Sequence, residues 1–184
     1  MDSAKPNAAS TSVRQVDLDT YVPAYLTWTS NKLSRGASQC YIKHFDIGIE
    51  TWRCLVLLAI NGSVSAPHVS RVTGMDKSSV SRCFKSMQAR GLIWLSQGPH
   101  LGRARLAVLT ERGRDLHDEI REITMERERA FLKVLSPDEV NVLLAMFRKL
   151  HENLPAVEVA TQQYIEKRQV RSKAPRHDVS FEGE

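Results

Sequence analysis

Hydrophobic positions recur with helical spacing over most of the chain, and glycine, asparagine and proline mark the breaks between segments. Across residues 22–41 the apolar and small residues recur every three or four positions, which places them on one face of a long helix. Gly48 ends this pattern. A second helix is predicted over about residues 49–60, ending at Asn61 and Gly62. Because it is apolar nearly all round, this second helix should be buried.

Two shorter helices are predicted next. Ser65 can cap the first, which ends at Gly74, and Asp76 can cap the second, which runs to about residue 90. Apolar and polar residues occupy opposite faces of the second helix. The apolar face carries Val80, Cys83, Phe84 and Met87, and the polar face carries Ser78, Ser79, Arg82, Lys85 and Ser86. We expect the apolar face to pack on a core and the polar, basic face to meet solvent.

The next segments predict a hairpin followed by two long helices. Residues 92–95 and 105–109 are short strand-like runs, and the glycines and proline between them mark a turn with Arg103 at its tip. Thr110 can cap a long amphipathic helix over about residues 110–134. Ser136 and Glu139 then form a capping box ahead of a last amphipathic helix.

This order of elements predicts a mainly α fold with a small β-hairpin wing. It is a winged helix-turn-helix with N-terminal and C-terminal dimerisation helices. The domain covers residues 18–154, with a DNA-binding lobe at about 47–109 and dimerisation helices at 18–46 and 110–154. Residues 1–17 and 155–184 lack a periodic apolar face and are predicted to be a flexible N-terminal tail and a polar, largely flexible C-terminal tail.

Pairing of two copies is expected from the terminal helices. Their apolar faces exceed what one winged-helix core of about 70–80 residues can bury, which favours a homodimer. The alternative is that these helices pack only on each other within one chain.

Length and composition narrow the class of protein. The chain has 184 residues, 42% of them hydrophobic, and a formal net charge of +5. Its longest strongly apolar run, residues 54–60, is too short to span a bilayer, and no apolar signal core is visible near the N-terminus, so we expect a cytoplasmic protein. The odd number of cysteines and the absence of a CxxC pair indicate reduced core thiols. These cysteines are Cys40, Cys54 and Cys83.

The basic charge is concentrated in the middle of the chain. Seven basic residues lie between positions 69 and 105 against the single acidic residue Asp76. From position 110 to position 134 the balance reverses, with seven acidic residues against six basic ones. Such segregation is what polyanion binding requires.

The second short helix has the residues that a DNA-recognition helix needs. Ser78, Ser79 and Arg82 are suited to the major groove, because short polar side chains allow close approach and a guanidinium can make two hydrogen bonds to guanine. Lys77 and Lys85 would attract phosphates, and Arg103 would enter the minor groove. The alternatives are that Arg82 holds a phosphate, or that this is only a solvated basic face.

At this point the sequence resembles a known family. The stretch SAPHVSRVTGMDKSSVSRCFKSMQARGLIWLS, followed by RARLAVLTERG, resembles the core of the MarR family of dimeric winged-helix transcription regulators, over roughly residues 22–154. The resemblance implies that Ser78, Ser79, Arg82 and Lys85 contact operator DNA and that Arg103 is the wing-tip arginine. The family usually has an acidic residue two positions before that arginine, where this chain has Leu101.

The resemblance also implies an effector site. Family members often bind small aromatic effectors in a cleft between the dimer helices and the DNA-binding lobe, here near the middle of the first helix and the start of the second. Two indoles could sandwich an aromatic ring, two hydroxyls could bind its polar group, and two basic side chains could neutralise a carboxylate. These residues are Trp28 and Trp52, Ser34 and Thr51, and Arg35 and His44. The alternative is that the indoles are core and Arg35 is solvated.

The expected function is therefore a homodimeric repressor released from its operator by a small aromatic carboxylate, benzoate-like or nicotinate-like, since the chain also resembles members that control aromatic-acid catabolism. One alternative is an effector-independent architectural DNA-binding protein. Another is a thiol-based redox regulator, although Cys54 and Cys83 lie on apolar stripes. No enzyme signature or clustered metal-ligand motif is present, so no catalytic residue, metal site or cofactor is expected.

Overall fold

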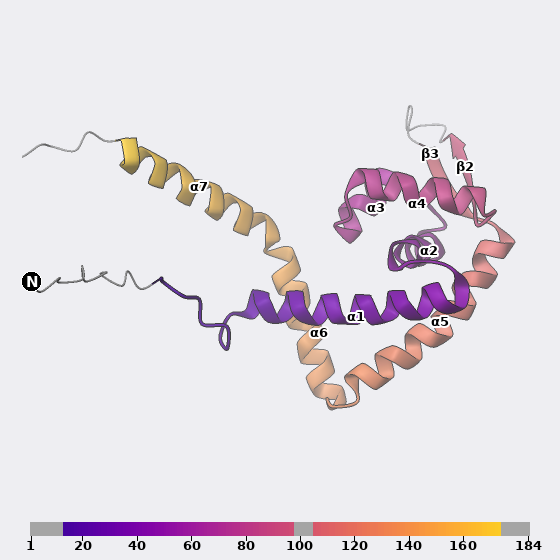
Figure 1. Ribbon diagram of the computed structural model, residues 1–184, viewed down its shortest axis with the longest axis horizontal. Helices are drawn as coiled ribbons and strands as arrows, with labels where there is room; N and C mark the ends of the chain where they lie inside the picture. Colours follow the sequence, from indigo (N-terminus) through magenta and orange to yellow (C-terminus); the bar gives the residue numbers. More distant parts are fainter. Residues whose placement is uncertain (1–12, 98–104, 174–184) are drawn as a thin grey trace, which may run out of the picture. The chain divides into compact units, whose positions relative to one another are not determined.

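The computed structural model describes residues 13–97 and 105–173. The chain divides within its fifth helix into two compact units, one up to Glu126 and one from Arg127 onward, called here the N-terminal and C-terminal units. Among the described residues, no helix combines the length and the apolar character needed to cross a membrane. Figure 1 shows that helices dominate both units.

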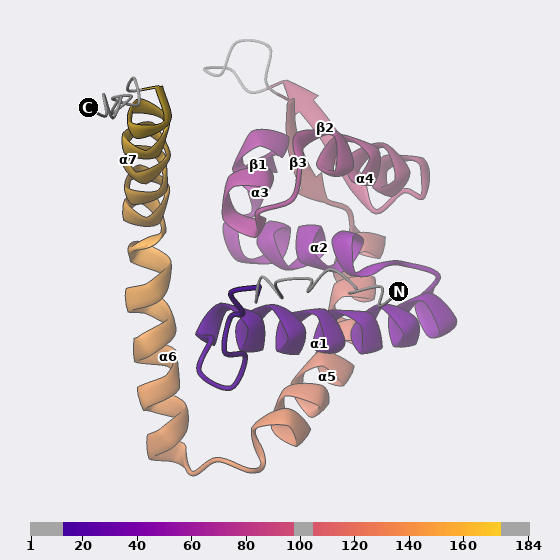
Figure 2. The ribbon, with the colours of Figure 1, turned by 60° about the vertical axis from the view of Figure 1, so that its left-hand side comes forward.

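The N-terminal unit begins with two helices whose limits follow their sequence signals. Helix α1 spans Val22–Phe45 and helix α2 spans Ile49–Asn61. Asp46 ends α1 in a left-handed conformation, and Gly62 ends α2 with a positive φ of 71°. Figures 1 and 2 show α2 lying between α1 on one side and the next two helices on the other. The prediction that α2 is buried is confirmed for the face that carries Trp52, Cys54, Leu55 and Leu58, whereas Ile60 near the end of the helix is exposed.

Helices α3 (Ala66–Thr73) and α4 (Lys77–Ala89) form the helix-turn-helix. Both predicted caps are confirmed, since the Ser65 side chain accepts a hydrogen bond from the amide of His68 and Asp76 accepts one from the amide of Ser79. The turn between the helices is held by side chains. Ser70 Oγ donates to the carbonyl oxygen of Met75 at 2.7 Å, which fixes the angle at which α4 starts.

The wing belongs to a three-stranded antiparallel sheet rather than to the two-stranded hairpin that we predict from the sequence. Strand β3 (Arg105–Leu109) lies between β2 (Ile93–Gln97) and a short β1 (Ser63–Ser65). Val64 pairs with Ala107 in β1, and Trp94 pairs with Val108 in β2. Three residues between a helix end and a helix cap give too little alternation to predict a strand, which is why β1 is absent from the sequence interpretation.

The core of the N-terminal unit joins α1, α2, α3, α4, the sheet and the first half of α5 (Glu111–Leu132). Its fully buried side chains include Tyr41, Leu55, Leu58, Val69, Val80, Met87, Leu92, Ile93 and Ile120. Gly113 allows α5 to lie close to the start of β2, because a Cβ atom at this position would lie 2.1 Å from the carbonyl oxygen of Leu92. The predicted cap also holds, since Thr110 Oγ1 accepts a hydrogen bond from the amide of Gly113 at 3.0 Å. These contacts set the position of the wing against the core.

The C-terminal unit consists of the end of α5, helix α6 (Pro137–Glu152) and helix α7 (Leu154–Lys173). The predicted capping box is confirmed, with the amide of Ser136 donating to Glu139 Oε2 at 2.7 Å. Helix α7 occupies much of the segment that the sequence interpretation assigns to the C-terminal tail. Its apolar residues do not gather on one face, so helical periodicity gives no signal for it.

Candidate nucleic-acid interface

Helix α4 has one face in the core and the opposite face in solvent, as the sequence predicts. Val80, Cys83, Phe84 and Met87 are all buried. On the other side Lys77, Ser78, Arg82 and Lys85 are exposed and Ser79 is half-buried. We call the side formed by these five residues the polar face of α4. A rigid helix with a continuous polar and basic face is the form of element that enters the major groove of DNA.

Hydrogen bonds link the residues at the start of this face into a network. Ser78 Oγ donates to Asp76 Oδ1 and Ser79 Oγ donates to Asp76 Oδ2, both at 2.6 Å. Arg82 in turn donates to Ser78 Oγ at 3.2 Å and to Ser79 Oγ at 2.9 Å. The guanidinium of Arg82 is therefore held along the exposed surface of the helix before any partner is present, which reduces the side-chain entropy lost on binding.

The Asp76 carboxylate anchors this network electrostatically. Hydrogen bonds from the side chains of Ser78 and Ser79 and from the amide of Ser79 hold its pKa well below the usual value, because they stabilise the ionised form. The carboxylate therefore stays charged at every pH near neutrality. The Asp76 carboxylate oxygens accept hydrogen bonds from the hydroxyls of Ser78 and Ser79. The oxygens of these two hydroxyls in turn accept hydrogen bonds from Arg82.

The other end of α4 is attached to α1. Arg90 donates hydrogen bonds to the backbone carbonyls of Phe45 and Asp46 and forms an ion pair with the Asp46 carboxylate at 3.6 Å. This arginine is one of the seven basic residues of the middle segment, yet its role here is structural. The basic surface available to a polyanion is correspondingly smaller than the charge count indicates.

The described part of the wing adds fewer basic side chains to this surface than α4 does. Arg105 is exposed at the start of β3, where it pairs with Gln97 of β2. The predicted wing-tip residue, Arg103, lies outside the described residues. Trp94 is 70% exposed on β2, and the sequence interpretation gives it no role.

The two tryptophans predicted to sandwich an effector lie in different surroundings. Trp28 on α1 is exposed and contacts the ring of Tyr25, with centroids 6.2 Å apart. Trp52 on α2 is buried, stacks on the ring of His117 at 5.4 Å and meets Tyr41 at 5.9 Å. Among the described aromatic rings, these two indoles do not pair with each other.

The remaining predicted effector residues divide between half-buried and exposed positions. Ser34 and Thr51 are half-buried, while Arg35 and His44 are exposed. Ser34 accepts a hydrogen bond from Arg53 Nη2 at 3.3 Å. Arg53 is half-buried and the sequence interpretation omits it, although a basic residue inside a nearly all-apolar run is a signal that could have found it.

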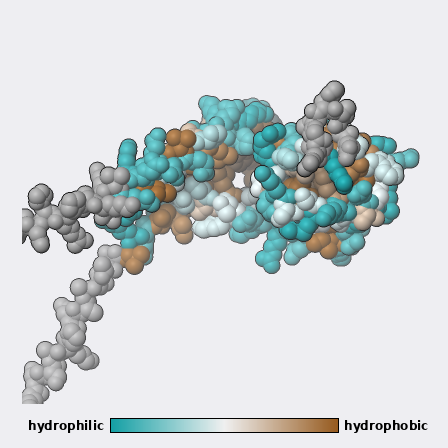
Figure 3. Space-filling view, turned by 90° about the horizontal axis from the view of Figure 1, so that it is seen from above, coloured by the Kyte–Doolittle hydropathy of each residue, from teal (hydrophilic) through white to brown (hydrophobic). Residues whose placement is uncertain are grey.

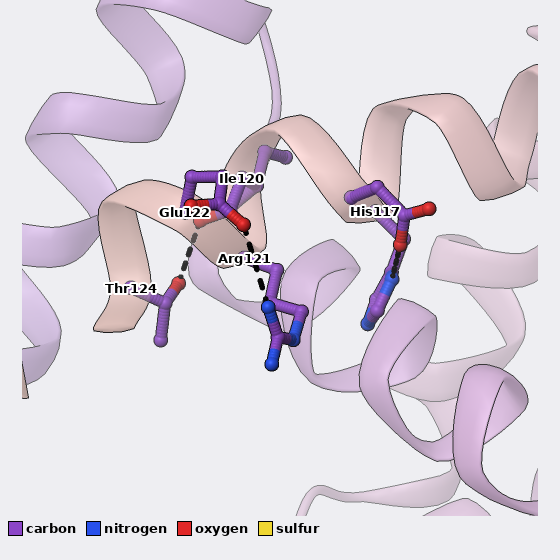
Figure 4. A network of polar contacts seen from close by, with 6 residues as sticks. His117, Ile120, Arg121, Glu122 and Thr124 are labelled. Carbon is purple, nitrogen blue, oxygen red and sulfur yellow. Dashed lines mark hydrogen bonds and ion pairs between the residues drawn. The ribbon is translucent and has the colours of Figure 1, made fainter. Parts of the chain in front are cut away.

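Helix α5 supplies a second set of polar groups to this part of the N-terminal unit (Figure 4). His117 Nδ1 lies 2.8 Å from Asp118 Oδ1, and the imidazole is largely buried against Trp52. Thr124 Oγ1 donates to the carbonyl oxygen of Ile120 at 2.9 Å and shares a 2.8 Å hydrogen bond with the hydroxyl of Tyr41. Tyr41, Thr124 and His117 thus join α1 and α5 around the buried indole of Trp52 on α2, and these rings form the aromatic cluster of the N-terminal unit.

Comparison with known proteins decides the family. The family model described as "MarR family" matches residues 45–104, which include α2, both helices of the helix-turn-helix and strands β1 and β2. The match over this segment confirms the resemblance to the MarR family. The crystal structure of a MarR/EmrR family transcriptional regulator from Acinetobacter sp. ADP1 is 26% identical and has a TM-score of 0.71, covering 77% of this chain and 99% of that one. Both matches are to transcriptional regulators, which indicates that this chain is a transcriptional regulator.

Two further proteins are similar to this chain. The HTH-type transcriptional repressor IacR of Pseudomonas putida is 26% identical over 113 residues, which cover 61% of this chain and 68% of the relative. Bordetella bronchiseptica BpsR, whose DNA binding is regulated by 6-hydroxynicotinic acid, has a TM-score of 0.64 at 21% identity, covering 76% of this chain and 99% of that one. At that identity the second likeness shows the shared fold.

Proposed function

We propose that this chain is a homodimeric repressor that binds operator DNA through α4 and the wing and is released by a small aromatic carboxylate. The observation that carries the proposal is the hydrogen-bonded network of Asp76, Ser78, Ser79 and Arg82 on the polar face of α4. It presents a pre-oriented guanidinium on a helix whose opposite face is fixed in the core.

The DNA-binding role divides among the polar residues by chemistry. Arg82 is the base-contacting residue, because a guanidinium can make two parallel hydrogen bonds to guanine. Ser78 and Ser79 allow the helix backbone to approach the base edges closely. Lys77, Lys85 and the wing residue Arg103 attract phosphates or enter the minor groove. The repressor relative in Pseudomonas putida supports the same class of function.

Dimerisation is supported by the apolar side chains that the single chain leaves open. No residue of α6 is buried, although Leu144, Phe147 and Leu150 repeat along one side of this helix. Figure 3 shows hydrophobic side chains lying open among hydrophilic ones on the molecular surface. Burying each such side chain against a second copy would contribute about 1.5–3 kcal/mol. A dimer would also place two recognition helices on two half-sites.

The effector proposal rests on the aromatic cluster of α1, α2 and α5 and on its polar neighbours. Trp28 offers exposed aromatic surface and Trp52 is the buried indole of the cluster. Ser34 and Thr51 offer hydroxyls, and Arg35 and His44 are exposed basic side chains. Arg53 joins this set, because a half-buried guanidinium bound to Ser34 is suited to a carboxylate. Regulation of the Bordetella relative by an aromatic acid supports the same class of ligand. An effector of this kind must bind the DNA-free conformation more tightly than the DNA-bound one.

The experiment is a competition between DNA and aromatic acids. The full chain is bound to a fluorescent duplex that it has selected from random sequences, and affinity is measured with benzoate, nicotinate or 6-hydroxynicotinate present. We expect at least one of these acids to weaken binding. Cyclohexanecarboxylate controls for the aromatic ring and nicotinamide controls for the carboxylate, and neither should act.

The result also separates the two parts of the proposal. Sequence-selective binding that none of the acids alters would support the proposed repressor role and contradict the proposed aromatic effector. Equal binding to selected and random DNA would instead indicate an architectural DNA-binding protein.

A further inference from the structure

Helix α7 carries its charges unevenly along its length. Between Leu154 and Ile165 the only charged residue is Glu158, whereas five basic residues and no acidic one follow between positions 167 and 176. The basic residues are Lys167, Arg168, Arg171, Lys173 and Arg176. Every residue from 154 to 169 is exposed, and Figures 1 and 2 show α7 extending away from α6 within the C-terminal unit. The basic charge of α7 is thus concentrated in its second half.

Three of these basic residues share one side of the helix with a tyrosine. Tyr164, Lys167, Arg168 and Arg171 stand at positions i, i+3, i+4 and i+7, which follow one side of an α-helix. We call the side formed by these four residues the basic face of α7. Tyr164 is 64% exposed. A phenol hydroxyl among cations suits phosphate, because both kinds of group donate hydrogen bonds to its oxygens.

The acidic residue next to this face in the sequence is engaged elsewhere. Glu166 Oε1 accepts a hydrogen bond from Gln162 Nε2 at 2.8 Å, and both residues lie on the side of the helix that faces away from the basic face. Among the side chains that the structure describes, no carboxylate lies within ion-pair distance of Lys167 or Arg168. The charge of these two cations is therefore available to a polyanion.

We propose that the basic face of α7 binds the phosphate backbone of duplex DNA outside the operator half-sites. The inference rests on the proposed function, because α7 would meet flanking duplex at a high effective concentration once α4 holds an operator. From position 164 to position 171 the helix rises about 10 Å, the length of about three base-pair steps. Three cations and one hydroxyl can therefore contact neighbouring phosphates without reading bases.

The pattern of side chains on α7 favours DNA over a membrane surface. A helix that lies in a membrane interface carries its cations opposite a continuous apolar face. In α7 the apolar residues do not gather on one face, and Tyr164 lies among the cations rather than opposite them. Attraction between charges is thus the main interaction that this helix offers, and duplex DNA has a dense row of negative charges.

The first test uses the wild-type chain, so that no variant has to fold. Affinity is measured by fluorescence anisotropy for a duplex that holds only the selected operator and for the same operator lengthened by about 10 base pairs of unrelated sequence at each end. We expect the longer duplex to bind about tenfold more tightly or better at ~150 mM salt, with a steeper salt dependence. Equal affinity and equal salt dependence for the two duplexes would overturn the proposal.

A variant then assigns the gain to α7. On the longer duplex, Lys167→Gln/Arg168→Gln/Arg171→Gln should reduce the slope of log K against log salt by about 2.7 for each α7 that is engaged, because each phosphate contact contributes about 0.9. The operator-only duplex should be bound nearly as tightly as by the wild type. Glutamine is a good helix former, so circular dichroism should show unchanged helix content. A variant that keeps the full gain from the longer duplex would overturn the proposal.

A matched control separates the basic face from net charge. Arg121→Gln/Lys133→Gln/Lys149→Gln removes the same formal charge from exposed positions outside α7 and should retain the wild-type slope. Equal loss of slope in the two triple variants would show a general effect of charge and would contradict a contact at α7.

The outcomes also separate this inference from the proposed function. Preference for the selected operator without any gain from flanking DNA would support the repressor role and contradict the inference about α7. If the wild type shows no sequence preference and the α7 variant still loses slope, the proposed function fails and the phosphate-binding face is supported. Binding to phosphatidylglycerol vesicles without any gain from flanking DNA would assign the basic face to a membrane and overturn the proposal.

Discussion

The two units of the chain bury their apolar side chains to very different degrees. The N-terminal unit has a continuous core that runs from Tyr41 to Ile120 and includes both helices of the helix-turn-helix. In the C-terminal unit none of the described residues 127–169 is buried, although α6 carries a regular apolar face. The first unit has the buried interior of a stable domain, whereas the described residues of the second unit expose their apolar side chains.

This difference shows where each unit obtains its stability. The N-terminal unit positions α4 through contacts within one chain, including Arg90 to α1 and Gly113 to the strand start. The exposed apolar side chains of the C-terminal unit are the ones that the proposed dimer would bury. Changes in the first unit should therefore alter stability or DNA binding without altering the oligomer, and changes in α6 should do the reverse.

The largest effect is expected from charges on the apolar face of α6. The double variant Leu144→Asp/Phe147→Asp should convert the dimer to a monomer, because two buried carboxylates without partners would oppose association. Sedimentation velocity measures the change. Lys149→Asp, on the side of the same helix that faces away from Leu144 and Phe147, is the control and should remain dimeric. A double variant that stays dimeric would show that α6 is not the interface.

The core of the N-terminal unit should give the next largest effect. Leu55→Ala is expected to lower the free energy of unfolding by about 2–5 kcal/mol, because Leu55 is 0% exposed and its removal leaves a cavity. Ile60→Ala on the same helix is the matched control, since Ile60 is 73% exposed, and should change stability by about 0.5 kcal/mol or less. Urea unfolding measures both. Equal losses would contradict the placement of the core.

Loss of the pre-oriented guanidinium should weaken operator binding and leave the dimer intact. Arg82→Ala is expected to cost about 1–3 kcal/mol in affinity for a selected duplex, measured by fluorescence anisotropy. Arg82→Lys keeps the charge but not the paired hydrogen bonds, so it should lose sequence preference more than overall affinity. Arg121→Ala on α5 controls for the loss of one surface arginine. Unchanged affinity in Arg82→Ala would contradict the proposal that Arg82 on α4 contacts a base.

The smallest effect is expected at the cap of α4. Asp76→Ala should lower thermal stability, whereas Asp76→Asn, which can still cap the helix, should retain most of it. Because the folded state holds the Asp76 pKa below its usual value of 3.8, its charge contributes stability that is fully present above that pH and is lost as the pH falls further. The difference in melting temperature between the wild type and Asp76→Ala should therefore shrink in acid. A difference that grows in acid would contradict the network around Asp76.

Local signals in the sequence predict most of the fold. Caps at Ser65, Asp76, Thr110 and Ser136 and the glycine endings locate the helices, because these residues satisfy helix ends in any context. Strand β1 and helix α7 are not predicted from the sequence, and each has a physical reason. The first is three residues long, and the second has no apolar face that would reveal its period.

The site is predicted less completely, because its chemistry depends on contacts between distant segments. The polar face of α4 follows from one helical period, so its residues are found together. The pairing of Cys54 with Cys83 and the stacking of Trp52 on His117 arise only when α2 meets α4 and α5. Neither contact leaves a pattern in the linear sequence.

The measurement that tests the central claim most directly is selection of DNA by the purified protein. The full chain is used to enrich duplexes from a random pool, and its affinity for the enriched duplex is compared with that for a scrambled duplex at ~150 mM salt. The account predicts a site with two related halves about one helical turn apart and a preference of about a thousandfold or more. Equal affinity for both duplexes would contradict it.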